Sequence, residues 1–205
     1  MVTIQFKPLR TKVISHETRQ TSGLNPVLPS VGVNPTPKIA KGATALVRGE
    51  GHWDPNYEGN NLFEELIYNI SSARENAHSS GQLRCFVWVQ GEYEKRLWVK
   101  ARGAARDSLL NDYKARFRKL VDAVREASET PGARVAIIEL SAANATSDPM
   151  LPESDINLTE AGVSPADQKL ATLAIQKMQL ELAQDPGVKL VKSVGIEKNL
   201  DNVHY

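Results

Sequence analysis

The sequence contains one cysteine, four histidines, few aromatic residues and no long apolar run. Because Cys85 is alone, no internal disulfide can form, and the redox compartment stays undecided. No run approaches the roughly 18 apolar residues of a membrane span. The opening MVTIQFKPLRTK lacks the apolar core of a secretory signal. We therefore expect no membrane insertion and no signal peptide, while an extracellular or virion location stays open.

Neither sign of charge is in excess, because the chain has 25 basic and 24 acidic residues and a net charge of +1. This balance gives no electrostatic reason to expect nucleic acid as a partner. The scattered histidines form no cluster with metal-ligand spacing, and no P-loop or dinucleotide fingerprint is present. We expect no metal and no other cofactor. The 205 residues suffice for one domain with a sizeable core.

Residues 1–36 differ from the rest of the chain in being rich in proline, as in SGLNPVLPSVGVNPTPK. Proline fixes one backbone angle and biases the preceding residue toward extended conformations. We predict an extended arm or lead-in, with a short strand at Lys12–Ser15. The alternative on composition alone is a disordered tail.

From Pro37 onward, apolar residues recur with regular spacing, which predicts a domain over residues 37–205. Helical spacing predicts helices over 61–78, about 104–128 and 164–184. A serine cap at Ser164, followed by Pro165, is typical of the start of the last helix. A short strand is expected in KIAKGATAL, and continuous apolar runs predict buried strands at 83–90, 133–140 and 188–194. The long polar loop 141–163 between two of these elements is of a kind that is often functional.

This alternation of strands and long helices predicts an α/β fold, a three-layer α/β/α sandwich with a mostly parallel sheet. In such sheets, ligands bind at the carboxyl ends of the strands. Polar or glycine residues follow three of the expected strands, namely Gly42, the group Gln90-Gly91-Glu92, and the pair Asp201 and His204. Their convergence on one edge is the main argument for a site there.

Each of these features has a plainer interpretation when it is taken alone. Gln90 and Glu92 can be a strand-to-loop turn with a solvated carboxylate, and Gly42 can be an ordinary strand-ending glycine. Asp201 and His204 have the spacing of a general base oriented by a carboxylate, or they can belong to a frayed terminus. His52 and Trp53, in the loop after the first expected strand of the domain, can line a substrate cleft.

The ordered segments KIAKGATAL…HW, CFVWVQGEYE, VAIIEL and AIQKMQLELAQDPGVKLV…LDNVHY resemble the SGNH-hydrolase superfamily. The nearest branch is the sialate O-acetylesterase and carbohydrate acetylesterase group. The resemblance covers about residues 37–205. Its most specific part is Trp88-Val89-Gln90-Gly91-Glu92, while Asp-x-x-His is specific only through its place in the order.

The resemblance implies serine ester hydrolysis of an acetylated glycan or polysaccharide. It implies that Gly42 and Gln90 supply oxyanion-hole donors and that Asp201 and His204 form the acid–base pair. Glu92 would be a supporting residue behind them.

The sequence departs from this family where the nucleophile should lie, because no Gly-Asp-Ser or Gly-Gln-Ser-Asn block is present. The most similar segment is RQTSGL, which makes Ser22 a weak candidate for the nucleophile. Tyr93-Glu94 also replaces the family's usual Ser-Asp, and the chain stops one residue after His204.

Two functional hypotheses follow. One is a carbohydrate O-acetylesterase whose missing parts come from a partner chain or a further segment. The other is an inactive esterase-derived structural or glycan-binding module, for example a phage virion or tail component. In that case the N-terminal arm would contact a neighbouring subunit or a second copy of the chain.

Overall fold

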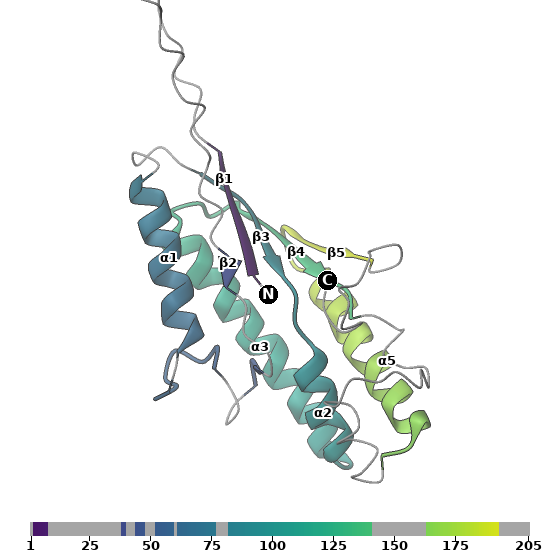
Figure 1. Ribbon diagram of the computed structural model, residues 1–205. Helices are drawn as coiled ribbons and strands as arrows, with labels where there is room; N and C mark the ends of the chain where they lie inside the picture. Colours follow the sequence, from purple (N-terminus) through teal and green to yellow (C-terminus); the bar gives the residue numbers. More distant parts are fainter. Residues whose placement is uncertain are drawn as a thin grey trace, which may run out of the picture.

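The structure, a computed structural model, describes residues 2–7, 38–39, 44–47, 52–59, 61–76, 82–140 and 163–192. These residues form one five-stranded sheet in the order β2-β1-β3-β4-β5 (Figure 1). The strands are β1 (Val2–Lys7), β2 (Lys38–Ile39), β3 (Gln82–Trp88), β4 (Arg134–Ile138) and β5 (Val188–Val191). The helices are α1 (Leu62–Asn76), α2 (Glu92–Lys100), α3 (Ala104–Ala127) and α5 (Pro165–Leu182).

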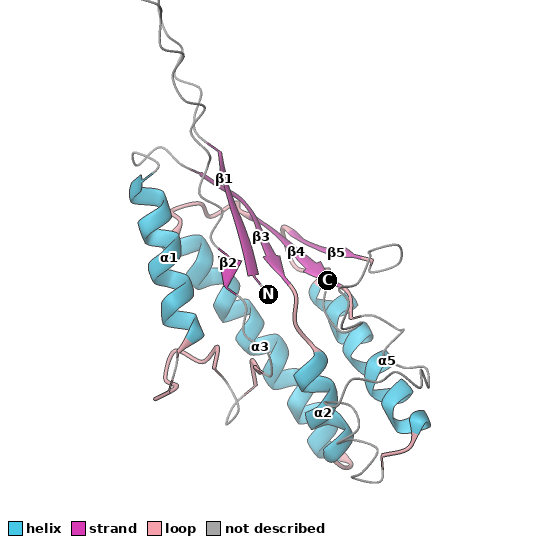
Figure 2. Cartoon of the chain, viewed as in Figure 1, coloured by secondary structure: helices cyan, strands magenta, loops and turns pink. Residues whose placement is uncertain are grey.

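The strands β3, β4 and β5 are parallel neighbours, and long helices connect them in sequence. This arrangement confirms the predicted α/β class. Connections of this kind are almost always right-handed, so two that step in the same direction place their helices on one face of the sheet. Accordingly α1, α3 and α5 contribute to one apolar core against the sheet (Figure 2). The second helical layer of the expected three-layer sandwich is not among the described residues.

The buried face of β3 carries Leu83, Phe86 and Trp88, which are not spaced by two as in a regular strand. The pairing with β1 explains this spacing, because Gln5 lies opposite Cys85 while Phe6 lies opposite Leu83. One residue of β3 is therefore extra, as in a β-bulge, which returns the next side chains to the same face. The bulge keeps three large apolar residues in the core.

The elements expected from apolar periodicity are present with small shifts at their ends. The N-cap prediction is confirmed, since the Ser164 hydroxyl accepts a hydrogen bond from the backbone N–H of Asp167 over 3.1 Å. Two elements are additions to the prediction. Residues 2–7 of the expected arm form β1, which pairs antiparallel with both β2 and β3, and residues 92–100 form α2. The strand predicted at Lys12–Ser15 lies outside the described residues.

Within the described ranges, no helix has the length and apolar character that crossing a membrane would require.

Candidate functional site

Gln90 lies just beyond the carboxyl end of β3, and its side chain is partly buried. Its amide nitrogen Nε2 donates a hydrogen bond to the backbone carbonyl of Thr44 over 2.5 Å and lies 3.3 Å from the Thr44 hydroxyl. Thr44 is itself buried. The end of β3 is therefore fixed to the segment 44–47, which follows β2 in the chain.

Glu94 fixes the same segment from the first turn of α2. Its Oε1 accepts a hydrogen bond from the backbone N–H of Leu46 over 2.7 Å. Its other oxygen, Oε2, is buried without a hydrogen-bond partner among the described residues. Burial raises the pKa of Glu94 to about 7, although backbone N–H groups, first that of Leu46, act in the opposite direction. Near neutral pH this carboxyl group is therefore poised between its two protonation states.

An aromatic cluster supports Thr44 from the other side. The indole N–H of Trp53 donates to the Thr44 hydroxyl over 3.2 Å, and the Trp53 ring meets the Trp88 ring edge-on, with centroids 5.0 Å apart. The indole N–H of Trp88 in turn donates to the hydroxyl of Tyr113 on α3 over 2.9 Å. Trp53 thus packs inside the molecule, with 3% of its surface exposed, while its neighbour His52 is partly buried.

Gly91 and Gln179 set the direction of the chain as it leaves β3. Gly91 has φ +140°, a conformation that side chains rarely adopt, and a Cβ atom there would lie 3.0 Å from a methyl group of Ile175. The buried Gln179 amide donates to the carbonyls of Gln90 and Ile138 and accepts from the backbone N–H of Leu140. One side chain of α5 therefore ties together the carboxyl ends of β3 and β4.

The structure describes two of the residues that were predicted for the site. Gln90 lies in the position just given. Glu92 is partly exposed at the start of α2, and no hydrogen-bond partner of its side chain is found in the part of the chain that is described. Gly42, Asp201 and His204, together with the candidate nucleophile Ser22, lie outside the described residues.

Sequence reasoning missed Glu94, Gln179 and Thr44 as parts of this site. A detectable signal existed for Gln179, because it continues the apolar stripe of α5, where a polar residue needs buried partners. Glu94 carried no such signal, since its neighbour Glu92 offered the same chemistry at the position matching the motif.

The arrangement supplies a rigid amide donor at the edge of the sheet where ligands bind in parallel α/β folds. Gln90 Nε2 carries two hydrogens, and the acceptors found for them among the described residues are the Thr44 carbonyl at 2.5 Å and, over the longer distance of 3.3 Å, the Thr44 hydroxyl. An oxyanion can replace that longer contact, and preorganised N–H donors are the usual means of stabilising one. Within the described ranges, no group of three or more His, Cys, Asp or Glu side chains can hold a metal ion.

Comparison with known proteins identifies one matching family. The sequence model of the family described as "carbohydrate esterase, sialic acid-specific acetylesterase" matches residues 37–205, which is most of the chain. No curated protein and no solved structure gives a significant match. The matched range contains Gln90, its partner Thr44 and all the parallel strands. The chain belongs to the carbohydrate esterase, sialic acid-specific acetylesterase family.

Proposed function

We propose that the chain is a carbohydrate O-acetylesterase that removes acetyl groups from a glycan or polysaccharide. The observation that carries the proposal is the contact between Gln90 and Thr44, which holds an amide donor rigidly at the carboxyl edge of the sheet. Membership of the carbohydrate esterase family supports the class of substrate. The net charge of only +1 gives no reason to prefer a nucleic-acid substrate.

In the proposed reaction, a serine hydroxyl attacks the acetyl carbonyl while His204 takes its proton. Asp201 holds the imidazole in the required tautomer and stabilises the imidazolium that forms. The Gln90 amide and the Gly42 backbone N–H bind the tetrahedral oxyanion. Collapse of this intermediate expels the sugar oxygen, which receives the proton from His204. Water, activated by His204, then releases acetate and restores the serine.

The proposed mechanism needs a serine nucleophile. Ser22 is the candidate within the chain, and a serine from a partner chain is the alternative. The supporting residues are better defined, since Gln179, Gly91 and Glu94 hold the strand ends around Gln90. The positioning role predicted for Glu92 stays part of the proposal, with Glu94 acting beside it.

The test is hydrolysis of p-nitrophenyl acetate and of an O-acetylated monosaccharide by the purified full chain. We expect turnover above buffer, and its loss in His204→Ala with an unchanged circular dichroism spectrum. His78→Ala is the matched control, because His78 has no partner at catalytic spacing in the sequence and no role in the proposed reaction. Activity that is equal in both variants would overturn the role of His204.

A second function is a catalytically inactive glycan-binding or structural module, such as a virion component. It is favoured by one observation, that the family match begins at residue 37, after the weak nucleophile candidate Ser22. A folded chain that binds an acetylated glycan without hydrolysing it would support this second function. The N-terminal arm would then be the expected contact with neighbouring subunits.

A further inference from the structure

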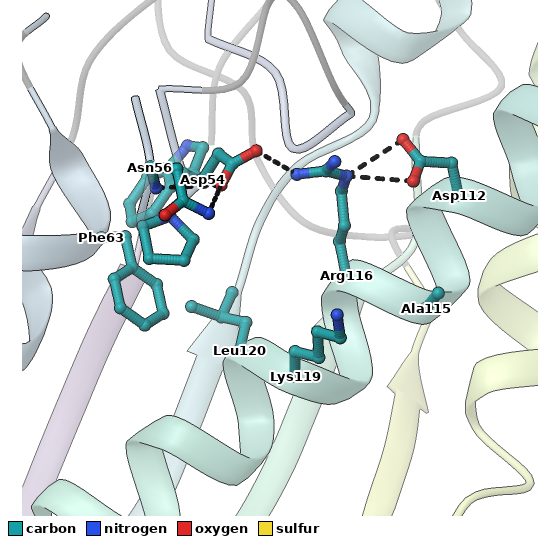
Figure 3. Close-up of a pocket in the computed structure, with 10 residues that line it drawn as sticks. Asp54, Asn56, Phe63, Asp112, Ala115, Arg116, Lys119 and Leu120 are labelled. Carbon is teal, nitrogen blue, oxygen red and sulfur yellow. Dashed lines mark hydrogen bonds and ion pairs between the residues drawn. The ribbon is translucent and has the colours of Figure 1, made fainter. Parts of the chain in front are cut away.

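A hollow of about 450 Å³ lies on the outside of the molecule, between the loop 52–59, the start of α1 and the middle of α3 (Figure 3). This volume falls within the range of small-molecule sites, roughly 300–1,000 Å³. The exposed Pro55 and the partly buried Phe63 provide apolar surface in the hollow, while Trp53 and Leu120, which also line it, are almost fully buried. The exposed residues Asn56 and Lys119 lie at its rim. The hollow therefore offers a ligand both apolar and polar surface.

Arg116 is held in a fixed orientation at the polar side of this hollow. Its Nη1 donates to Asp54 over 2.5 Å, and its Nε contacts both oxygens of Asp112, the shorter distance being 3.0 Å (Figure 3). About 19% of the Arg116 side chain is exposed. Among the described residues, no hydrogen bond from its third nitrogen, Nη2, is found. A rigid guanidinium thus keeps two N–H donors for a ligand.

The charges that line the hollow cancel. Two carboxylates, Asp54 and Asp112, face two cations, Arg116 and Lys119. Although burial opposes it, hydrogen bonds from Asn56 and Arg116 lower the pKa of Asp54, so its carboxylate is ionised at neutral pH. A free anion would meet the two carboxylates, and a free cation would meet the guanidinium and the ammonium. A neutral ligand with many hydroxyl groups avoids both penalties and can exchange hydrogen bonds with both kinds of side chain.

We propose that this hollow binds a neutral sugar unit, as a saccharide site separate from the site around Gln90. The apolar C–H face of a pyranose ring would lie on the apolar surface of Phe63 and Pro55. Its hydroxyls would accept from Arg116 Nη2 and Lys119 and donate to the carboxylates. The proposal goes beyond ester hydrolysis, because none of these residues belongs to the proposed reaction.

The position of the hollow connects it with the catalytic proposal through one residue. Trp53 lines the hollow and also donates to the Thr44 hydroxyl, and Thr44 receives the Gln90 amide. The two sites thus share one buried residue, Trp53. A longer glycan held in the hollow would keep its other sugar units close to the chain and raise their effective concentration at the second site.

The test is saturation-transfer NMR on the full chain with three probes: N-acetyllactosamine as the neutral saccharide, 3′-sialyllactose as an acidic one, and a glucosamine dimer as a cationic one. Ala115 is an exposed helical residue that lines the hollow, so Ala115→Trp should fill it without disturbing the core. Ala166→Trp, at an exposed position near the start of α5, is the matched control.

We expect saturation transfer from the wild type to N-acetyllactosamine. Ala115→Trp should weaken the affinity for this sugar about tenfold or more, and Ala166→Trp should leave the affinity unchanged. Equal binding by the wild type and Ala115→Trp would place the sugar elsewhere and overturn the proposal. Binding of only the charged probes, or of none, would also overturn it. The experiment measures binding and needs no hydrolysis. Ala115→Trp should not change the affinity of a sugar bound at the Gln90 site. The outcome is therefore independent of the catalytic proposal.

Discussion

The carboxylate of Glu94 accepts a hydrogen bond from the backbone N–H of Leu46, a residue 48 positions earlier in the chain. Four residues before Glu94, the Gln90 amide holds the carbonyl of Thr44. Glu94, in the first turn of α2, and Gln90, just beyond the end of β3, therefore hold one short segment, 44–47, at two points. This segment begins two residues after Gly42, the proposed backbone donor.

The raised pKa of Glu94 predicts a pH dependence of stability with a definite sign. Its pKa is about 7 in the fold, against an ordinary value of 4.5, so between these values the folded chain binds more protons than the unfolded chain. The free energy of unfolding should therefore fall as pH rises from about 4.5 to about 7, by at most roughly 3 kcal/mol.

The measurement is urea unfolding of the wild type and Glu94→Gln at about pH 5 and about pH 8. The variant keeps an acceptor for Leu46 but cannot ionise. It should resemble the wild type at the lower pH and be more stable than it at the higher pH. A difference between the two proteins that is the same at both pH values would contradict the assigned role.

Replacing Gln179 with leucine should destabilise the fold, because three buried or partly buried backbone groups each lose a partner at once. These are the carbonyls of Gln90 and Ile138 and the N–H of Leu140. We expect a loss of about 2 kcal/mol or more in the free energy of unfolding. Gln176→Leu is the control, since that partly exposed side chain makes one hydrogen bond. Equal losses in the two variants would show that the strand ends do not depend on Gln179.

Gly91→Ala should also be costly, for a reason of backbone conformation and space. The residue has φ +140°, and the added methyl group would lie 3.0 Å from Ile175. A loss of about 1–3 kcal/mol is expected in thermal or urea unfolding. Gly132→Ala, where a methyl group would meet nothing within 4 Å, should stay within about 0.5 kcal/mol of the wild type. A neutral Gly91→Ala would mean that the turn after β3 relaxes freely.

The long helices and the parallel strands could be predicted from the sequence, because their buried residues are apolar and recur with the period of the element. The helix α2 could not, since its buried positions include Glu94 and Lys95, which leave no apolar stripe. For β1 a signal was present, as Val2, Ile4 and Phe6 alternate with polar residues. The prolines that follow led us to assign those residues to the arm instead.

At the candidate site, the position of Gln90 in the fold could be predicted from the sequence. A polar residue that directly follows a buried parallel strand lies at the carboxyl edge of the sheet. The partners of Gln90 could not be predicted. The contact between Glu94 and Leu46 joins residues far apart in the chain, and it depends on where the first turn of α2 points. The same holds for Gln179, whose three partners come from the ends of two strands.

The central claim is that the Gln90 amide stabilises the oxyanion of an acetyl ester during hydrolysis. The most direct test is to measure kcat for an O-acetylated monosaccharide with the wild type and two variants, Gln90→Leu and Gln184→Leu. Gln184 is the control, because it is exposed and lies beyond the end of α5. The account predicts a loss of about 10²- to 10³-fold in kcat for Gln90→Leu, with little change in KM, and normal turnover for Gln184→Leu. Unchanged kcat in folded Gln90→Leu, or a wild type without turnover, would contradict it.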